Sequence, residues 1–150
     1  MATEKAIQEG IQTVIRGIAA FDDESVQINR DVFLDGSLDY SPFFNIITAD
    51  EFGIRQDTVT ETGFYEVGAI LYVEWEDWET SYNDMRDRRQ DIIDTFGAVG
   101  TARSAGGIDG VDIPEIRSGG PIVPVTYDDD PDAFPVLLMQ LLIFRVDIYG

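Results

Sequence analysis

Residues 134–149 read FPVLLMQLLIFRVDIY, and this stretch decides the fold. Between Val136 and Phe144 every position except Gln140 is apolar, so an extended chain is hydrophobic on both faces. A strand of this kind lies in the middle of a sheet and is covered on both sides. From Arg145 onward only one face remains apolar. We therefore predict a central strand with helices over one face. The chain's own loops or a second subunit must cover the other face.

A second long strand is predicted at residues 62–75, which read TGFYEVGAILYVEW. One of its faces is apolar throughout and the other is mixed, which is the alternation expected of a strand. At ~3.3 Å per residue this strand is roughly 45 Å long, more than a small core requires. We expect it to project beyond the domain or to bend at Gly68.

Apolar residues spaced three or four positions apart predict two helices, over residues 3–21 and 80–96. Thr3 is the expected N-cap of the first helix, and Gly97 is expected to end the second. Shorter extended segments are predicted at residues 26–28, 32–34, 43–47 and 122–127. This order of elements predicts a single domain over residues 1–150 with an α+β fold. Its antiparallel or mixed sheet of about four to six strands is backed by two α-helices.

Two segments are expected to be flexible. Residues 97–121 contain seven glycines and one short alternating piece, and residues 50–62 form a long polar connection. Contacts with partner proteins are expected to order both segments, with plain mobile loops as the alternative. The apolar residues expected to anchor them in a neighbouring protein are Phe52, Ile54 and Ile108.

The composition excludes many functions. The chain has 29 Asp and Glu against 10 Lys and Arg, a net charge of −19, and neither His nor Cys. Such a surface repels nucleic acid and anionic lipid, and the chain offers neither an imidazole nor a thiolate. Its longest apolar run is shorter than the ~20 residues of a membrane span, and its first residues lack the basic region of a signal peptide. The acidity is typical either of an ordinary acidic protein or of a halophilic one, in whose molar salt the Debye length falls to about 3 Å.

No catalytic, cofactor-binding or metal-binding residue is predicted, and we do not expect an enzyme. Asp128, Asp130 and Asp132 have the spacing of the start of a calcium loop, but Ala133 and Met139 occupy the positions that need Gly and a bidentate Glu. A solvated acidic turn is the favoured interpretation. Two interpretations stay open for the Trp75–Trp78 stretch. It is either a binding surface, or one core aromatic followed by one at the corner between strand and helix.

The layout of the chain resembles that of tail terminator (tail completion) proteins of long-tailed bacteriophages, with lambda as the familiar case, and of related archaeal tailed viruses. The features that match span nearly the whole chain. They are the amphipathic first helix, the short strands through PFFNII at residues 42–47, the GFYEV start of the long strand at residue 63, the second helix, and the closing strand that ends in FRVDIY at residues 144–149.

The resemblance implies a structural virion protein that forms a ring, expected to be a hexamer, at the head-proximal end of the tail tube. It implies that the ring ends tube growth and joins the tail to the head connector, so that the partners are other copies of the chain, the tail tube protein and a connector or stopper protein. It further implies assembly in the host cytoplasm, and genomic DNA that passes nearby without specific binding.

Two other functions are kept as alternatives: another neck protein (a head–tail joining or stopper protein), and a halophilic ligand-binding or enzyme domain. A deep pocket with two or more inward carboxylates would favour the second alternative. The candidate subunit or partner contacts are Phe52, Ile54, Arg55, Phe64, Ile70, Tyr72, Ile108, Leu137, Met139 and Leu141.

Overall fold

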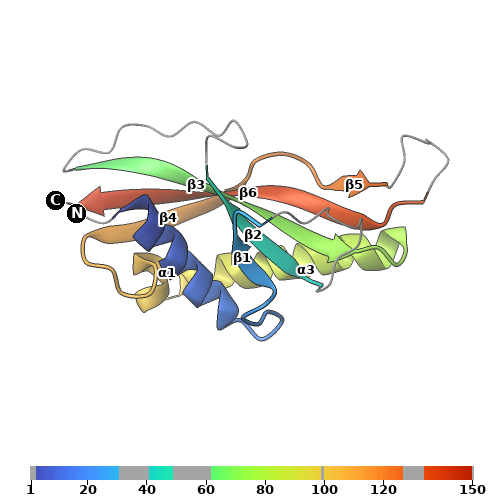
Figure 1. Ribbon diagram of the computed structural model, residues 1–150, viewed down its shortest axis with the longest axis horizontal. Helices are drawn as coiled ribbons and strands as arrows, with labels where there is room; N and C mark the ends of the chain where they lie inside the picture. Colours follow the sequence, from blue (N-terminus) through green and yellow to red (C-terminus); the bar gives the residue numbers. More distant parts are fainter. Residues whose placement is uncertain (1–2, 31–40, 49–61, 99, 127–133, 150) are drawn as a thin grey trace.

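A computed structural model describes residues 3–30, 41–48, 62–98, 100–126 and 134–149 (Figure 1). Its elements in chain order are α1 (Glu4–Arg16), β1 (Val26–Ile28), β2 (Phe43–Ile47), β3 (Thr62–Glu74), α3 (Trp78–Gly97), the 3₁₀ helix η1 (Thr101–Ser104), β4 (Val111–Ser118), β5 (Val123–Val125) and β6 (Leu137–Tyr149). The predicted α+β fold class is confirmed, because in these ranges two α-helices accompany a mixed sheet of six strands.

The long strands β3 and β6 form the centre of the sheet. The strand order is β1-β2-β3-β6-β4, and β5 also pairs with β6. Among the strand pairs of the described residues, only β1–β2 is parallel. The β3–β6 ladder runs without a break from the pair Thr62↔Tyr149 to the pair Glu74↔Leu137. It passes through Gly68 in register and extends along the long axis of the molecule (Figure 1). Pairing with β6 therefore continues through Gly68, while β2 covers only Gly68–Tyr72 of the other edge of β3.

Both helices lie on the same side of the sheet, called here the inner face (Figure 1). Helix α1 buries Ile7, Ile11 and Ile15 against this face, and α3 buries side chains such as Met85 and Phe96. They meet alternate residues of the two long strands, which also belong to the main core. These strand residues are Val67, Ala69, Leu71, Val73, Leu138, Leu142, Phe144, Val146 and Ile148.

The first helix is shorter than predicted. The Thr3 hydroxyl accepts a hydrogen bond from the backbone N–H of Ala6, as expected of the N-cap, but the helix ends at Arg16 and not at Phe21. Gly17 has low helix propensity, and from there the chain continues in tighter turns in which Ile18 bonds to Ile15. These turns bring Phe21 into the core, where its ring lies edge-on to another buried ring.

The second helix begins two residues earlier than predicted. The carboxylate of Asp77 is its N-cap and accepts hydrogen bonds from the N–H and the hydroxyl of Thr80 at 2.7 and 3.0 Å. Helix α3 also explains why Gln140 interrupts the apolar run of β6. The side-chain oxygen of Gln140 accepts a hydrogen bond from the Arg89 guanidinium at 2.8 Å, and its side-chain nitrogen donates to the carbonyl of Gly120 at 3.0 Å. The buried polar atoms of Gln140 thus find their hydrogen-bond partners within the chain.

The glycine-rich segment is ordered by the chain itself, so the expectation that partners order it is wrong for residues 100–121. Strand β4 pairs with β6 and buries Val111 and Ile113 in the main core. Ala105, which has a φ of 54°, packs against Gly10 of α1. The glycines allow the left-handed turn and the close approach of backbones that this arrangement needs.

The prediction for residues 50–61 lies outside the described residues, as do the predicted strand at 32–34 and the aspartates at 128–132.

Candidate functional site

The side of the sheet opposite the helices holds most of the candidate contact residues that the structure describes. We call this side the outer face, and it consists of alternate residues of the two long strands. These are Phe64, Glu66, Ile70 and Tyr72 of β3, and Leu137, Met139, Leu141, Ile143, Arg145 and Asp147 of β6. The sequence pattern therefore placed six candidates on one surface.

Part of the outer face is a second, smaller hydrophobic cluster. Phe43, Tyr72 and Leu137 are buried in it, and the rings of Phe43 and Tyr72 are 6.2 Å apart. Strand β5 pairs with the start of β6 here, so Val125 and Met139 are partly covered. The chain's own segments thus cover one end of the outer face. Tyr72 and Leu137 are buried and are not exposed contact residues in this structure.

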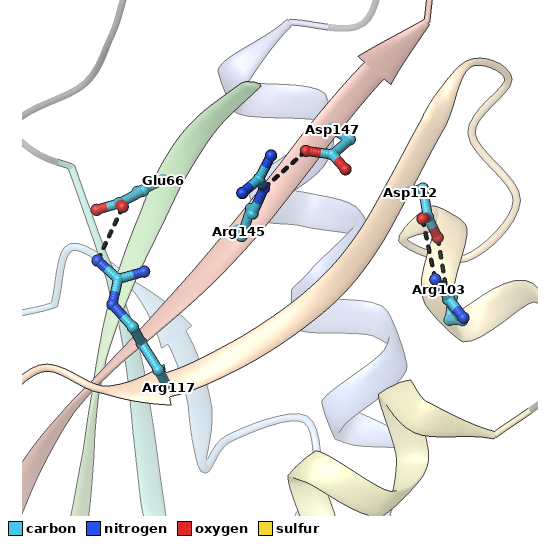
Figure 2. A network of polar contacts seen from close by, with 6 residues as sticks. All are labelled: Glu66, Arg103, Asp112, Arg117, Arg145 and Asp147. Carbon is cyan, nitrogen blue, oxygen red and sulfur yellow. Dashed lines mark hydrogen bonds and ion pairs between the residues drawn. The ribbon is translucent and has the colours of Figure 1, made fainter. Parts of the chain in front are cut away.

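The other part of the outer face carries a row of charged side chains (Figure 2). Arg117 of β4 reaches across to Glu66 of β3 at 2.8 Å, and Arg145 pairs with Asp147 on β6 at 3.0 Å. The Arg145 guanidinium also lies 4.5 Å from the centre of the Phe64 ring. The register explains the row, because Glu66 is directly opposite Arg145 in the ladder. Since all these groups are partly solvated, each ion pair contributes little to the stability of the fold.

A bidentate ion pair ends this row at the edge of the sheet. The Nε and one terminal nitrogen of Arg103 each donate to the Asp112 carboxylate at 3.0 Å (Figure 2). This hydrogen bonding raises the pKa of Arg103, and the bond to Asp147 likewise raises the pKa of Arg145. Both arginines therefore stay charged at every accessible pH, and the outer face combines fixed positive charges with carboxylates and aliphatic side chains.

The remaining candidates fall in different places. Phe64 is 39% exposed, and Ile70, Met139 and Leu141 are partly buried on the outer face. Ile108 is partly buried and packs against the main core, where the turn before β4 places it, so an anchoring role in a neighbouring protein stays a prediction. Phe52, Ile54 and Arg55 lie outside the described residues.

Sequence reasoning missed that exposed aromatic side chains gather at both ends of the long ladder. One end has Phe64 and Tyr149, which is 59% exposed. The other has Trp78 and Phe134, 55% and 82% exposed. Phe134 lies there because Val136, two residues later, accepts a hydrogen bond from the N–H of Trp75 and so extends the ladder past β3. The sequence signal for the second end was the close spacing of Trp75 and Trp78, whose interpretation had stayed open.

Two hollows border α3. One is an open groove of about 470 Å³ lined by Val14, Gly17, Ile18, Ala19, Ala20, Arg88, Asp91, Asp94 and Thr95, and a smaller one of about 110 Å³ lies between α3 and β4. In the larger groove Asp91 pairs with Arg88 at 3.2 Å, and Asp94 accepts a hydrogen bond from Gln90 at 2.7 Å. These carboxylates are not paired with each other for acid–base chemistry.

Within the described ranges, no three acidic side chains come together in a way that would hold a metal ion. No helix in those ranges is long and apolar enough to cross a membrane. No model of a known protein family matches the chain, and no curated protein matches it.

Proposed function

We propose that this chain is a structural virion protein that forms a ring at the head-proximal end of a phage-like tail tube. There it ends tube growth and joins the tail to the head connector. The observation that supports this proposal best is the exposure of large aromatic side chains at both ends of the β3–β6 ladder. A subunit that both self-associates and joins two assemblies needs at least two separate contact surfaces, and the exposed aromatic side chains at the two ends of the ladder are two candidates for them.

The end with Phe64 and Tyr149 supports self-association. Aromatic residues are enriched in protein interfaces, and this pair continues into the outer face with Ile70 and Leu141 only partly covered. The adjacent charged row offers both signs, so a second copy can meet it with complementary charges. A head-to-tail contact between a surface of this kind and a different surface of the next copy closes into a ring when the rotation allows it.

The charge of −19 is consistent with a ring through which DNA passes. A channel wall rich in carboxylates does not release counterions from the phosphate backbone and so gains no affinity for it. The proposed partners are therefore other copies of the chain, the tail tube protein and a connector or stopper protein, with DNA as a passing neighbour.

Sedimentation velocity at low and at molar salt tests self-association, because salt screens the repulsion between acidic copies. We expect a single oligomer, a hexamer, in at least one of these conditions, and a ring with an axial channel in electron micrographs. The double variant F64S/Y149S should dissociate the oligomer. The control V123S also removes an exposed hydrophobic side chain, but one on β5, and should leave the oligomer intact. A wild-type chain that stays monomeric in both salts and at high concentration would refute the proposal.

A further inference from the structure

We propose that the corner between β3 and α3 binds a cationic segment, rich in arginine or lysine, of a partner protein. The docking site consists of the side chains of Trp75, Trp78 and Tyr82 with the neighbouring carboxylates of Glu76 and Glu79. It lies at the end of the molecule away from the chain termini (Figure 1). The docking site deepens the proposed function, on which the identity of its partner as a virion protein rests.

The three aromatic rings form a fixed platform. The rings of Trp75 and Trp78 are 4.6 Å apart and nearly perpendicular, at 85°. The ring of Trp78 is 5.6 Å from that of Tyr82 and inclined to it by 30°. Trp78 and Tyr82 are four residues apart on one helix and so lie on the same side of it.

Two of the three rings of this platform pack against the core, and the third is largely exposed. Trp75 and Tyr82 are partly buried and pack against the main core, and the backbone N–H of Trp75 donates a hydrogen bond to the carbonyl of Val136, just before β6. Trp78, in contrast, leaves 55% of its surface exposed. A ring that is already positioned loses little conformational freedom when a partner covers it, and for this reason exposed Trp and Tyr often dominate the energy of an interface.

The charge around the platform selects a cation. Glu76, Asp77 and Glu79 are all exposed, and the sequence has no Lys or Arg between residues 56 and 85. Neither Glu76 nor Glu79 forms an ion pair with another described residue. Their charges are therefore available to a ligand of opposite sign.

The beginning of a helix favours anions, which argues against a cation site, but here a carboxylate offsets this effect. Asp77 caps the helix, and its hydrogen bonds from Thr80 lower its pKa, so it stays ionised and faces the positive end of the helix dipole. With that end neutralised, the two glutamates set the sign of the local field.

Arginine is the cation that this chain itself places on aromatic rings. Arg30 lies 5.9 Å from the centre of the Phe43 ring, and Arg145 lies 4.5 Å from that of Phe64. Trp binds cations more strongly than Phe does, and Trp78 is the exposed ring of the docking site, with Glu76 and Glu79 near it in the sequence. Nucleobases also stack on aromatic platforms, but the phosphates of a nucleic acid would meet these carboxylates.

The two tryptophans of the chain both belong to this site, so intrinsic fluorescence reports on it alone. The probe is a blocked hexapeptide in which arginine alternates with glycine, and the control peptide has citrulline in place of arginine. We expect a saturable change in tryptophan emission with the arginine peptide and no change with the citrulline peptide. Single-stranded oligothymidine is the third ligand, and tighter binding of it than of the arginine peptide would overturn the proposal.

Variants then locate the binding, with fluorescence anisotropy of a labelled arginine peptide as the readout. W78A should weaken binding about tenfold, since it removes the exposed ring. E76Q/E79Q should weaken it about threefold to tenfold. The matched control D84N/D87N removes two charges from exposed positions farther along α3 and should change affinity less than twofold. Circular dichroism confirms that each variant is folded, and E76Q/E79Q still tests the site if W78A unfolds.

If D84N/D87N and E76Q/E79Q lose the same affinity for the arginine peptide, the peptide is attracted only by the overall charge of the protein. This result would overturn the docking site. Unchanged binding by W78A would also overturn it. The two proposals fail separately, because W78A should sediment as the same oligomer as the wild type. Binding of the arginine peptide by a chain that is monomeric in every salt would leave the docking site standing and refute the ring.

Discussion

Replacing Gly10 by alanine should destabilise the protein, although alanine is the better helix former. A Cβ at position 10 would lie 2.2 Å from the carbonyl oxygen of Ala105 and 3.0 Å from its Cβ. The oxygen belongs to the backbone and cannot rotate away. To restore the 3.0 Å that real Cβ contacts respect, α1 and the turn before β4 must separate by about 0.8 Å.

The loss of stability follows from the packing contacts that this separation weakens. A gap of 0.5–1 Å forfeits roughly a quarter to a half of the dispersion energy of the atoms that face it. Overpacking of this kind costs about 1–3 kcal/mol, against a gain of up to about 1 kcal/mol in helix propensity. We therefore expect a net loss of about 1–2 kcal/mol for G10A. This loss corresponds to a fall of about 2–8 °C in Tm for a domain of this size.

Urea unfolding followed by circular dichroism measures this loss. G97A is the matched control, because nothing lies within 4 Å of a Cβ at that position in α3. It should leave the free energy of unfolding unchanged or raise it by up to about 1 kcal/mol. If G10A is as stable as the wild type, α1 and the turn at Ala105 do not approach each other as closely as described, and the reasoning is refuted.

Three further predictions concern stability. Q140L should cost about 1–3 kcal/mol in urea unfolding, because it leaves the Arg89 guanidinium without its partner; equal stability would contradict the role given to this hydrogen bond. D77A should lower Tm at neutral pH, and because the pKa of Asp77 is depressed, the difference from the wild type should vanish as the pH falls well below about 4; a constant difference would show that ionisation is not its cause. The wild type should melt at a higher temperature in molar KCl than in dilute buffer, since screening weakens the repulsion within a chain of charge −19; equal melting would refute this.

The sequence predicted those parts of the fold that depend on local periodicity. The long alternation of β3 and the two-sided apolar run of β6 gave both central strands within a few residues. Helix α3 was found from its apolar spacing and Gly97, although its start was placed late because Thr80 was taken for its beginning and Asp77 was not recognised as the cap. Local chemistry decides such features, so one sequence is sufficient to read them.

The features that were missed depend on contacts between distant residues. The glycine-rich segment was expected to be flexible because its local signals are weak, but pairing of β4 with β6 orders it. The ion pair between Glu66 and Arg117 joins residues 51 positions apart and requires the register of two ladders. The close approach of Gly10 to Ala105 likewise requires the complete fold. On the outer face the alternation identified the correct side of the sheet, but the chain's own cover over Tyr72 and Leu137 could not be read from it.

The unbroken ladder between β3 and β6 also has a mechanical consequence. Tyr149 ends one strand of the ladder, and the corner at Trp78 follows the end of the other strand at the opposite pole. A pull between these two points is directed along the strands, at right angles to the hydrogen bonds that join them. Such a load shears the ladder, so its hydrogen bonds share the tension and must rupture together, whereas a pull across the strands would open them one after another. A joint that transmits force between two assemblies would resist most strongly when strained along this axis.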